Sequence, residues 1–164
     1  MASAADVKQV LFFHEAQRTE AARVAIAGVA VGVIIPLVGW AIGQLILRPI
    51  FCQDSSSAAC GTSGMAAYYI ATVLVTAIAV PVLASWGVFR GLLVAVSAGV
   101  ALWGLQGYVS ALSGGSWLEY GLFSAALFGL AYLLFYWLMR LRNFGLGIVV
   151  SLLVILIVRW ALVT

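Results

Sequence analysis

Charged side chains are scarce in this sequence. Of its 164 residues, only 8% are Asp, Glu, Lys or Arg, whereas 65% are hydrophobic. Soluble domains typically carry about 25% charged and about 45–50% apolar residues. A chain of this length has too much surface relative to its volume to bury so large an apolar fraction in water. The shortage of charge therefore argues against a water-soluble domain and favours a protein whose solvent is a bilayer.

Titratable groups are also missing from the places where membrane chemistry needs them. The single lysine is Lys8 and the single histidine is His14, so the sequence lacks a span lysine for retinal and a second His for haem. The middle thirds of the apolar segments contain no Asp, Glu, Lys, Arg or His. They offer no proteolytic dyad and no buried carboxylate for proton coupling. We therefore predict a protein that is not an enzyme, with no cofactor and no metal site.

Five apolar segments of about 20 residues make up most of the chain, and a helix of this length crosses a hydrocarbon core about 30 Å thick. We predict an all-α, polytopic membrane protein in which residues 21–164 form a bundle of five transmembrane helices. The predicted spans cover residues 24–47, 65–85, 92–112, 120–139 and 144–163. Short turns make the later neighbours antiparallel. A four-span arrangement with one re-entrant segment is the alternative.

Residues 1–20 are the one mixed polar stretch of the sequence. Val7, Val10 and Leu11 share one helical face, and most of the charged residues fall elsewhere. This pattern predicts a short amphipathic helix that lies on the cytoplasmic membrane surface and leads into the first span.

Positive charges are distributed unequally between the two ends of the predicted spans. One end carries Lys8, Arg18, Arg23, Arg90, Arg140 and Arg142, and the other carries Arg48 and Arg159. Because loops rich in Lys and Arg stay in the cytoplasm, we expect a cytoplasmic N-terminus and a C-terminus outside. The small size and compact loops favour a bacterial inner membrane. The charges form no basic stripe, which argues against a nucleic-acid partner.

The two cysteines of the chain, Cys52 and Cys60, both fall in the first predicted loop, on the outer side. An oxidising outer compartment favours a disulfide bond between them. Such a bond would restrain a loop rich in Ser and Gly. A redox-active or metal-binding pair is the alternative, although the C-x-x-C spacing is absent and no His stands near.

Small residues line one face of the first predicted span. Gly28, Gly32, Pro36, Gly39 and Gly43 lie within a narrow sector of a helix, and we call them the glycine face. Membrane helices approach one another closely across G-x-x-x-G pairs of this kind, so the pattern predicts helix packing. The alternative is a helix that is broken at Pro36 to bind a solute, as in carriers with discontinuous helices.

Five polar side chains are candidates for contacts with neighbouring helices, lipid or solute. They are Gln44 and Gln106 within the spans, and Arg140, Arg142 and Arg159 at span ends. We expect the glutamines to form interhelical hydrogen bonds and the first two arginines to touch anionic lipid at the inner face. Arg159 is expected to snorkel to outer headgroups, with Glu119 or a lipid phosphate as alternative partners.

These features predict a non-enzymatic scaffold or accessory subunit that acts through helix packing. Its partners would be the lipid bilayer and either another membrane protein or a second copy of the chain. The alternative is a small carrier or oligomeric channel for an apolar or zwitterionic solute, or for lipid. A third hypothesis is an enzyme with its active groups in the outer loops, around Glu119, Asp54 and Arg48.

Overall fold

The structure, a computed structural model, describes the backbone of residues 4–52, 58–88, 90–105, 117–141 and 144–163. It describes the side chains of residues 18–52, 63–88, 90–105, 118–141 and 145–161. Every regular element in these residues is helical, which confirms the all-α prediction. In chain order the helices are α1 (Ala4–Ile42), the π-helical turn η1 (Gly43–Leu47), α2 (Arg48–Phe51), α3 (Ala58–Ser85), α4 (Gly91–Ala101), α6 (Trp117–Met139) and α7 (Phe144–Val163).

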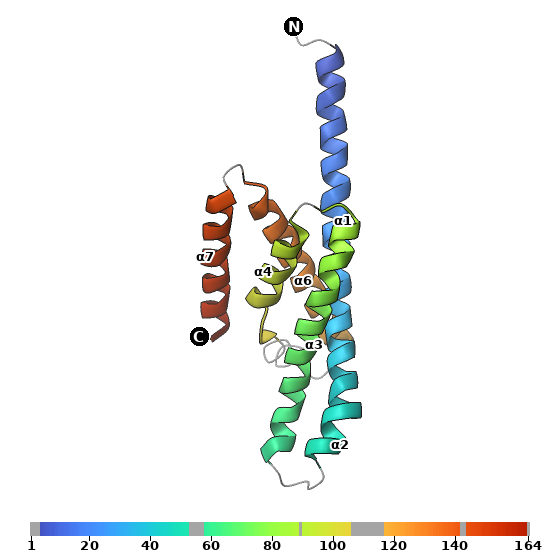
Figure 1. Ribbon diagram of the computed structural model, residues 1–164, viewed down its shortest axis with the longest axis vertical. Helices are drawn as coiled ribbons and strands as arrows, with labels where there is room; N and C mark the ends of the chain where they lie inside the picture. Colours follow the sequence, from blue (N-terminus) through green and yellow to red (C-terminus); the bar gives the residue numbers. More distant parts are fainter. Residues whose placement is uncertain (1–3, 53–57, 89, 106–116, 142–143, 164) are drawn as a thin grey trace.

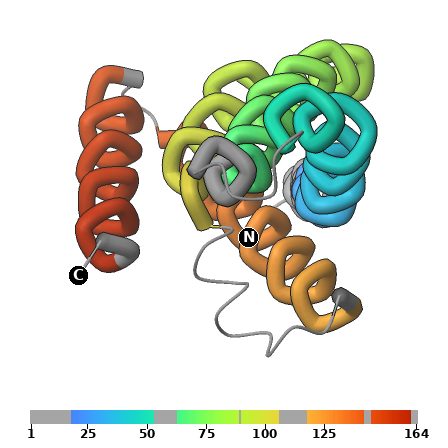
Figure 2. Tube along the Cα trace, turned by 90° about the horizontal axis from the view of Figure 1, so that it is seen from below, coloured from blue at the N-terminus to red at the C-terminus, as the bar shows by residue number. Residues whose placement is uncertain are grey.

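The helices form a bundle around an antiparallel pair, α1 and α3 (Figure 1). α6 packs against α1, and α4 packs against both α3 and α6. Figure 2 shows α7 at one side of the bundle, next to α4 and away from α1. The α1–α3 pair extends past the ends of α4 and α7 at the end that carries α2. At the opposite end, the N-terminal part of α1 projects beyond the other helices.

Among the described residues, three helical segments are long and apolar enough to cross a membrane, namely Arg18–Phe51, Ser63–Ser85 and Leu118–Met139. They contain the predicted spans 24–47, 65–85 and 120–139. α4 and the segment Gly145–Ala161 of α7 are shorter apolar helices. The sequence therefore placed the long helices correctly.

The predicted third span over residues 92–112 is not one continuous helix, and its residues 106–112 lie outside the described part of the chain. α4 has only 11 residues, which gives a length of about 16 Å, about half the thickness of a bilayer core. The chain leaves the helical conformation at Leu102, and Gly104 then adopts a φ of 86°. Such a positive φ is accessible to glycine at little cost, so Gly104 permits the chain to turn away from the helix axis.

The N-terminal segment is not a separate short helix. Residues 4–20 belong to the same helix, 39 residues long, as the first predicted span. Residues 19–27 join the two parts and contain neither Gly nor Pro, so nothing in the sequence interrupts the helix there. The side chains of residues 1–17 lie outside the described part, and their contact with a membrane surface stays a prediction.

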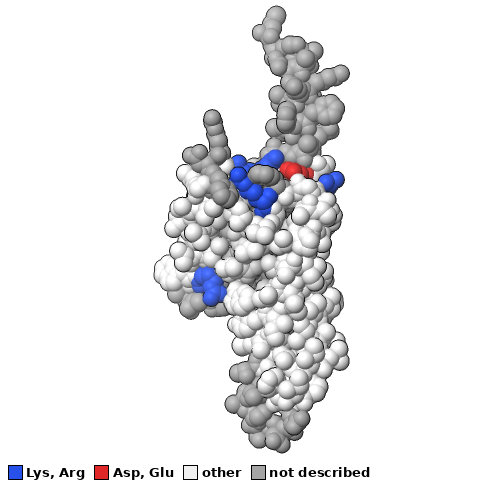
Figure 3. Space-filling view, viewed as in Figure 1, with Lys and Arg blue, Asp and Glu red and all other residues white. Residues whose placement is uncertain are grey.

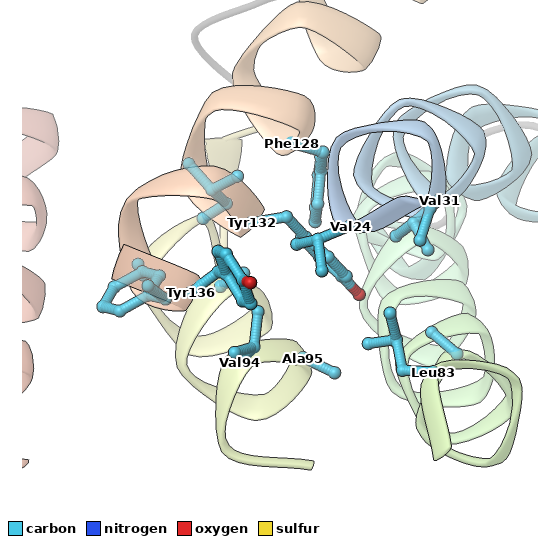
Figure 4. Packing of buried hydrophobic residues seen from close by; sticks show 14 of the residues in the cluster. Val24, Val31, Leu83, Val94, Ala95, Phe128, Tyr132 and Tyr136 are labelled. Carbon is cyan, nitrogen blue, oxygen red and sulfur yellow. The ribbon is translucent and has the colours of Figure 1, made fainter. Parts of the chain in front are cut away.

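The core lies where α1, α3, α4 and α6 meet. Its largest fully buried side chains are Tyr132, Phe128 and Phe135 of α6, together with Ile35 of α1 and Leu83 of α3. Figure 4 shows Phe128 and Tyr132 gathered with Val24 between α1 and α6. Aromatic side chains of α6 therefore fill the space that the smaller residues of α1 and α4 leave.

The backbones of α1 and α6 come into direct contact at two glycines. A methyl group built on Gly32 would lie 2.5 Å from the carbonyl oxygen of Ser124 and 2.7 Å from the Cα of Ala125. One built on Gly28 would lie 2.8 Å from the carbonyl oxygen of Phe128. These distances are too short for a side chain. Only glycine at both positions permits this approach.

We predict that Gly32→Ala destabilises the fold by about 1–3 kcal/mol, because the added methyl group forces α1 and α6 apart. Gly121→Ala in α6 is the matched control, since a methyl group there meets no atom within 4 Å and alanine favours the helix. Thermal unfolding of both variants in the same detergent micelles measures the difference. Equal unfolding midpoints would contradict the backbone contact.

Candidate functional site

The glycine face is covered by two helices of the same chain. Gly28 and Gly32 lie against α6, whereas Gly39 lies against the ring of Tyr68 in α3. Gly43 is the least crowded of the four, because a methyl group there would lie 3.5 Å from the nearest atom, also in α3. No open space for a solute lies over the first three of these glycines.

Pro36 does not break α1. The helix runs through Pro36 to Ile42, and the proline is fully buried. A solute-binding break at this position would need backbone outside the helical conformation, and the chain has none there. The interruption lies instead at Gly104, beyond α4. In the sequence, the signal for it is a pair of glycines at 104 and 107 inside the third predicted span.

Arg159 of α7 binds the carboxyl end of α4. Its Nη1 donates a hydrogen bond of 2.5 Å to the carbonyl oxygen of Trp103. Trp103 lies two residues beyond Ala101, the last residue of α4, so the guanidinium provides a donor for a carbonyl of the turn that follows the helix. Among the described residues, Arg159 forms no salt bridge with Glu119, which is exposed in the first turn of α6.

Two further arginines bind helix ends in the same way. Arg23 of α1 donates to the carbonyl oxygen of Trp86, just after α3, over 3.3 Å. Arg90 donates to that of Met139, the last residue of α6, over 2.7 Å. Arg90 itself has a φ of 63°, a conformation that costs a non-glycine residue about 1–3 kcal/mol. The charge pattern in the sequence predicted only a topological role for these arginines, and it contained no signal for their hydrogen bonds at helix ends.

A polar cluster joins α1 to α6 near the end from which the N-terminal part of α1 projects. The hydroxyl of Tyr136 donates a hydrogen bond of 2.7 Å to Oε2 of Glu20. Nη2 of Arg140 lies 3.5 Å from the same oxygen, and the guanidinium lies 5.3 Å from the centre of the Tyr136 ring. Figure 3 shows charged side chains gathered at this level of the bundle. The side chain of Arg140 is 41% exposed, so it is accessible from outside the bundle.

The remaining polar candidates are partly outside the described residues. Gln44 is exposed in η1, and its Oε1 accepts a hydrogen bond of 2.9 Å from Arg48. Its partner is therefore in the next turn of the same helix rather than in another helix. Gln106 and Arg142 lie outside the described residues, so their expected contacts stay predictions.

The cysteines and the outer-loop residues are likewise only partly described. Cys52 carries no free thiol, but the side chain of Cys60 lies outside the described residues, and the bond between the two stays a prediction. Asp54 also lies outside them. Within the described part of the chain, no ion pair joins Arg48 to Glu119, and no three His, Cys, Asp or Glu side chains gather as a metal site.

A groove of about 250 Å³ runs between α3 and α4 and ends at Trp103. Among the described residues that line it, Thr72 and Thr76 carry hydroxyl groups, Trp103 carries an indole N–H, and the others are apolar. The hydroxyl of Thr72 donates a hydrogen bond of 2.8 Å to the carbonyl oxygen of Tyr68, whereas Oγ1 of Thr76 is buried without a partner among the described residues. A smaller hollow of about 120 Å³ between α1 and α3 is apolar throughout.

No protein-family model matches this sequence, and no curated protein or solved structure matches it. The class that the fold itself defines is a helical bundle with three helices able to cross a membrane. The function must therefore be inferred from the residues and their arrangement.

We predict that Gly104→Ala destabilises the protein by about 1–2 kcal/mol, because alanine disfavours a φ of 86°. Crowding would not explain the loss, since the nearest atom to an added methyl group is 3.8 Å away. Gly64→Ala, within α3 and with no atom within 4 Å, is the matched control and should be neutral or stabilising. Thermal unfolding in one detergent compares the two variants, and an unchanged midpoint for Gly104→Ala would argue against the turn.

Proposed function

We propose that the chain is an integral membrane protein with its N-terminus in the cytoplasm and its C-terminus outside. α1, α3, α6 and α7 would cross the bilayer, and the segment that begins with α4 would provide the fifth crossing. The support is the apolar character of these helices and the unequal distribution of arginine. Arg18, Arg23, Arg90 and Arg140 belong to the proposed cytoplasmic end. A bacterial inner membrane would place Cys52 and Cys60 on its oxidising side, where a disulfide bond persists.

Within that membrane, we propose that the protein is a scaffold or accessory subunit. The observation that carries this proposal is the backbone contact of α1 with α6 at Gly28 and Gly32. This contact, together with the aromatic core beside it, fills the centre of the bundle. No charged residue lines either hollow in the described part of the chain. A filled, apolar interior suits a protein that acts through its outer surfaces.

The outer end of the α1–α3 pair offers such a surface. η1 and α2 project past the ends of α4 and α7 (Figure 1), and they expose large apolar side chains. Leu45 is 74% exposed and Ile50 is 61% exposed. Apolar groups that stand beyond the neighbouring helices favour contact with another protein. A second copy of the chain or a different membrane protein would fit this role.

The carrier hypothesis keeps one supporting observation, which is the interrupted helix at Gly104 beside an apolar groove. Carriers bind solutes where helices are discontinuous. The groove favours lipid or an apolar solute over a zwitterion, because its lining contains no charge.

The scaffold proposal is tested by extracting the tagged chain from its native membrane in a mild detergent and measuring its mass by native mass spectrometry. We expect a complex of fixed stoichiometry, and we expect Ile50→Ser to lower its yield. Ala84→Ser, at an exposed position at the other end of α3, is the control and should leave the yield unchanged. A monomer in the extract would contradict the scaffold.

A flux measurement separates the scaffold from the carrier. Liposomes that contain the purified chain are expected to release trapped glycine, and to transfer a fluorescent phospholipid between leaflets, no faster than protein-free liposomes. Release or transfer that depends on the protein would favour the carrier.

The proposed orientation is checked with Lys8→Cys in a background without Cys52 and Cys60, since an impermeant maleimide should reach this cysteine only from the cytoplasmic side.

A further inference from the structure

The apolar groove between α3 and α4 has a polar site at one end. Trp103 lines the groove, and its ring stacks on that of Tyr69, with the ring centres 5.2 Å apart. The carbonyl oxygen of the same Trp103 accepts the hydrogen bond from Arg159. The groove therefore opens toward a guanidinium and a phenol at the point where α4 ends.

Gly104 lies beside both of these polar groups. A methyl group built on Gly104 would lie 3.8 Å from the hydroxyl oxygen of Tyr69 and 3.9 Å from Nη1 of Arg159. Both groups therefore border the same small volume, from opposite helices of the bundle. We call this volume the Gly104 cradle.

The cradle offers hydrogen-bond donors and positive charge. A guanidinium has five N–H donors, and among the described residues Arg159 has only the carbonyl oxygen of Trp103 as a partner. The hydroxyl of Tyr69 forms no hydrogen bond in the described part of the chain, and its side chain is 36% exposed. An acceptor with negative charge complements this set, and guanidinium pairs well with phosphate.

The groove itself suits an acyl chain. Its α3 side runs from Thr72 to Val80, about 12 Å along the helix, and its walls are almost entirely apolar. Val73 and Val100 at its rim are 52% and 47% exposed, so the groove is open to the surroundings of the bundle. In a bilayer these surroundings are lipid chains.

We propose that the groove and the Gly104 cradle together bind one phospholipid of the outer leaflet. An acyl chain lies in the groove between α3 and α4, and the phosphate lies in the cradle between Arg159 and the Tyr69 hydroxyl. The lipid site rests on the membrane location proposed above and is independent of the scaffold role. A monomeric extract would therefore overturn the scaffold without affecting this site.

The site is tested by native mass spectrometry of the protein released from nanodiscs of dioleoylphosphatidylglycerol. The wild-type chain is expected to retain one phospholipid. Arg159→Gln should lower retention about tenfold, because it removes a charge-assisted contact, and Arg159→Lys should restore much of it. Tyr69→Phe keeps the stack on Trp103 and removes only the hydroxyl, so a loss of about fivefold is expected.

A second set of variants separates the groove from the cradle and leaves Arg159 in place. Ala77→Phe fills the groove and should lower retention as strongly as Arg159→Gln. Ala66→Phe, at an exposed position of α3 that does not line the groove, should not. We expect the thermal unfolding midpoints of Tyr69→Phe and Ala77→Phe to be close to that of the wild type. A lower lipid retention in these variants then reports lost binding and not lost folding.

Two further probes identify the part of the lipid that is recognised. Dioleoylglycerol, which has the chains without the phosphate, and inorganic phosphate, which has no chain, should both compete poorly with the phospholipid. Unchanged retention in Arg159→Gln, Tyr69→Phe and Ala77→Phe would overturn the proposal. A second result would also overturn the proposal. If inorganic phosphate displaced the lipid and Ala77→Phe retained the lipid normally, the cradle would be a site for free phosphate.

Discussion

The contact between the backbones of α1 and α6 sets the arrangement of the core. Gly28 and Gly32 bring the two helices within reach of one another's main chain, and the large side chains next to this contact are then confined. Phe128 and Tyr132 of α6 fill the space toward α3 and α4. In a bilayer, apolar side chains gain little by leaving lipid for protein, so such close van der Waals packing is the main source of association.

Three arginines donate hydrogen bonds to backbone carbonyls near the ends of other helices. The last carbonyls of a helix have no partner within the helix and need donors from elsewhere. Arg23, Arg90 and Arg159 supply them near the ends of α3, α6 and α4. Their donors join helices that are distant in the sequence.

The sequence was sufficient to predict the long helices and the packing role of small residues, because both follow from local composition and helical period. The length of α4 was not predicted, since Gly104 lies within a long apolar run. Glycine is common in membrane helices, and only its φ shows that the helix ends. The hydrogen-bond partners of Arg90 and Arg159 could not be predicted from the sequence either. They depend on which helix ends become neighbours, and a single sequence does not contain that information.

The central claim, that Gly28 and Gly32 of the glycine face pack against α6 of the same chain, has a direct test. Cγ2 of Val29 lies 2.9 Å from the Cβ position on Gly129, which is close enough for a disulfide bond. In a background without Cys52 and Cys60, Val29→Cys with Gly129→Cys should form an intrachain bond under mild oxidation in the membrane. Val29→Cys with Gly121→Cys should not. Absence of the bond, or bonds only between two chains, would contradict the account.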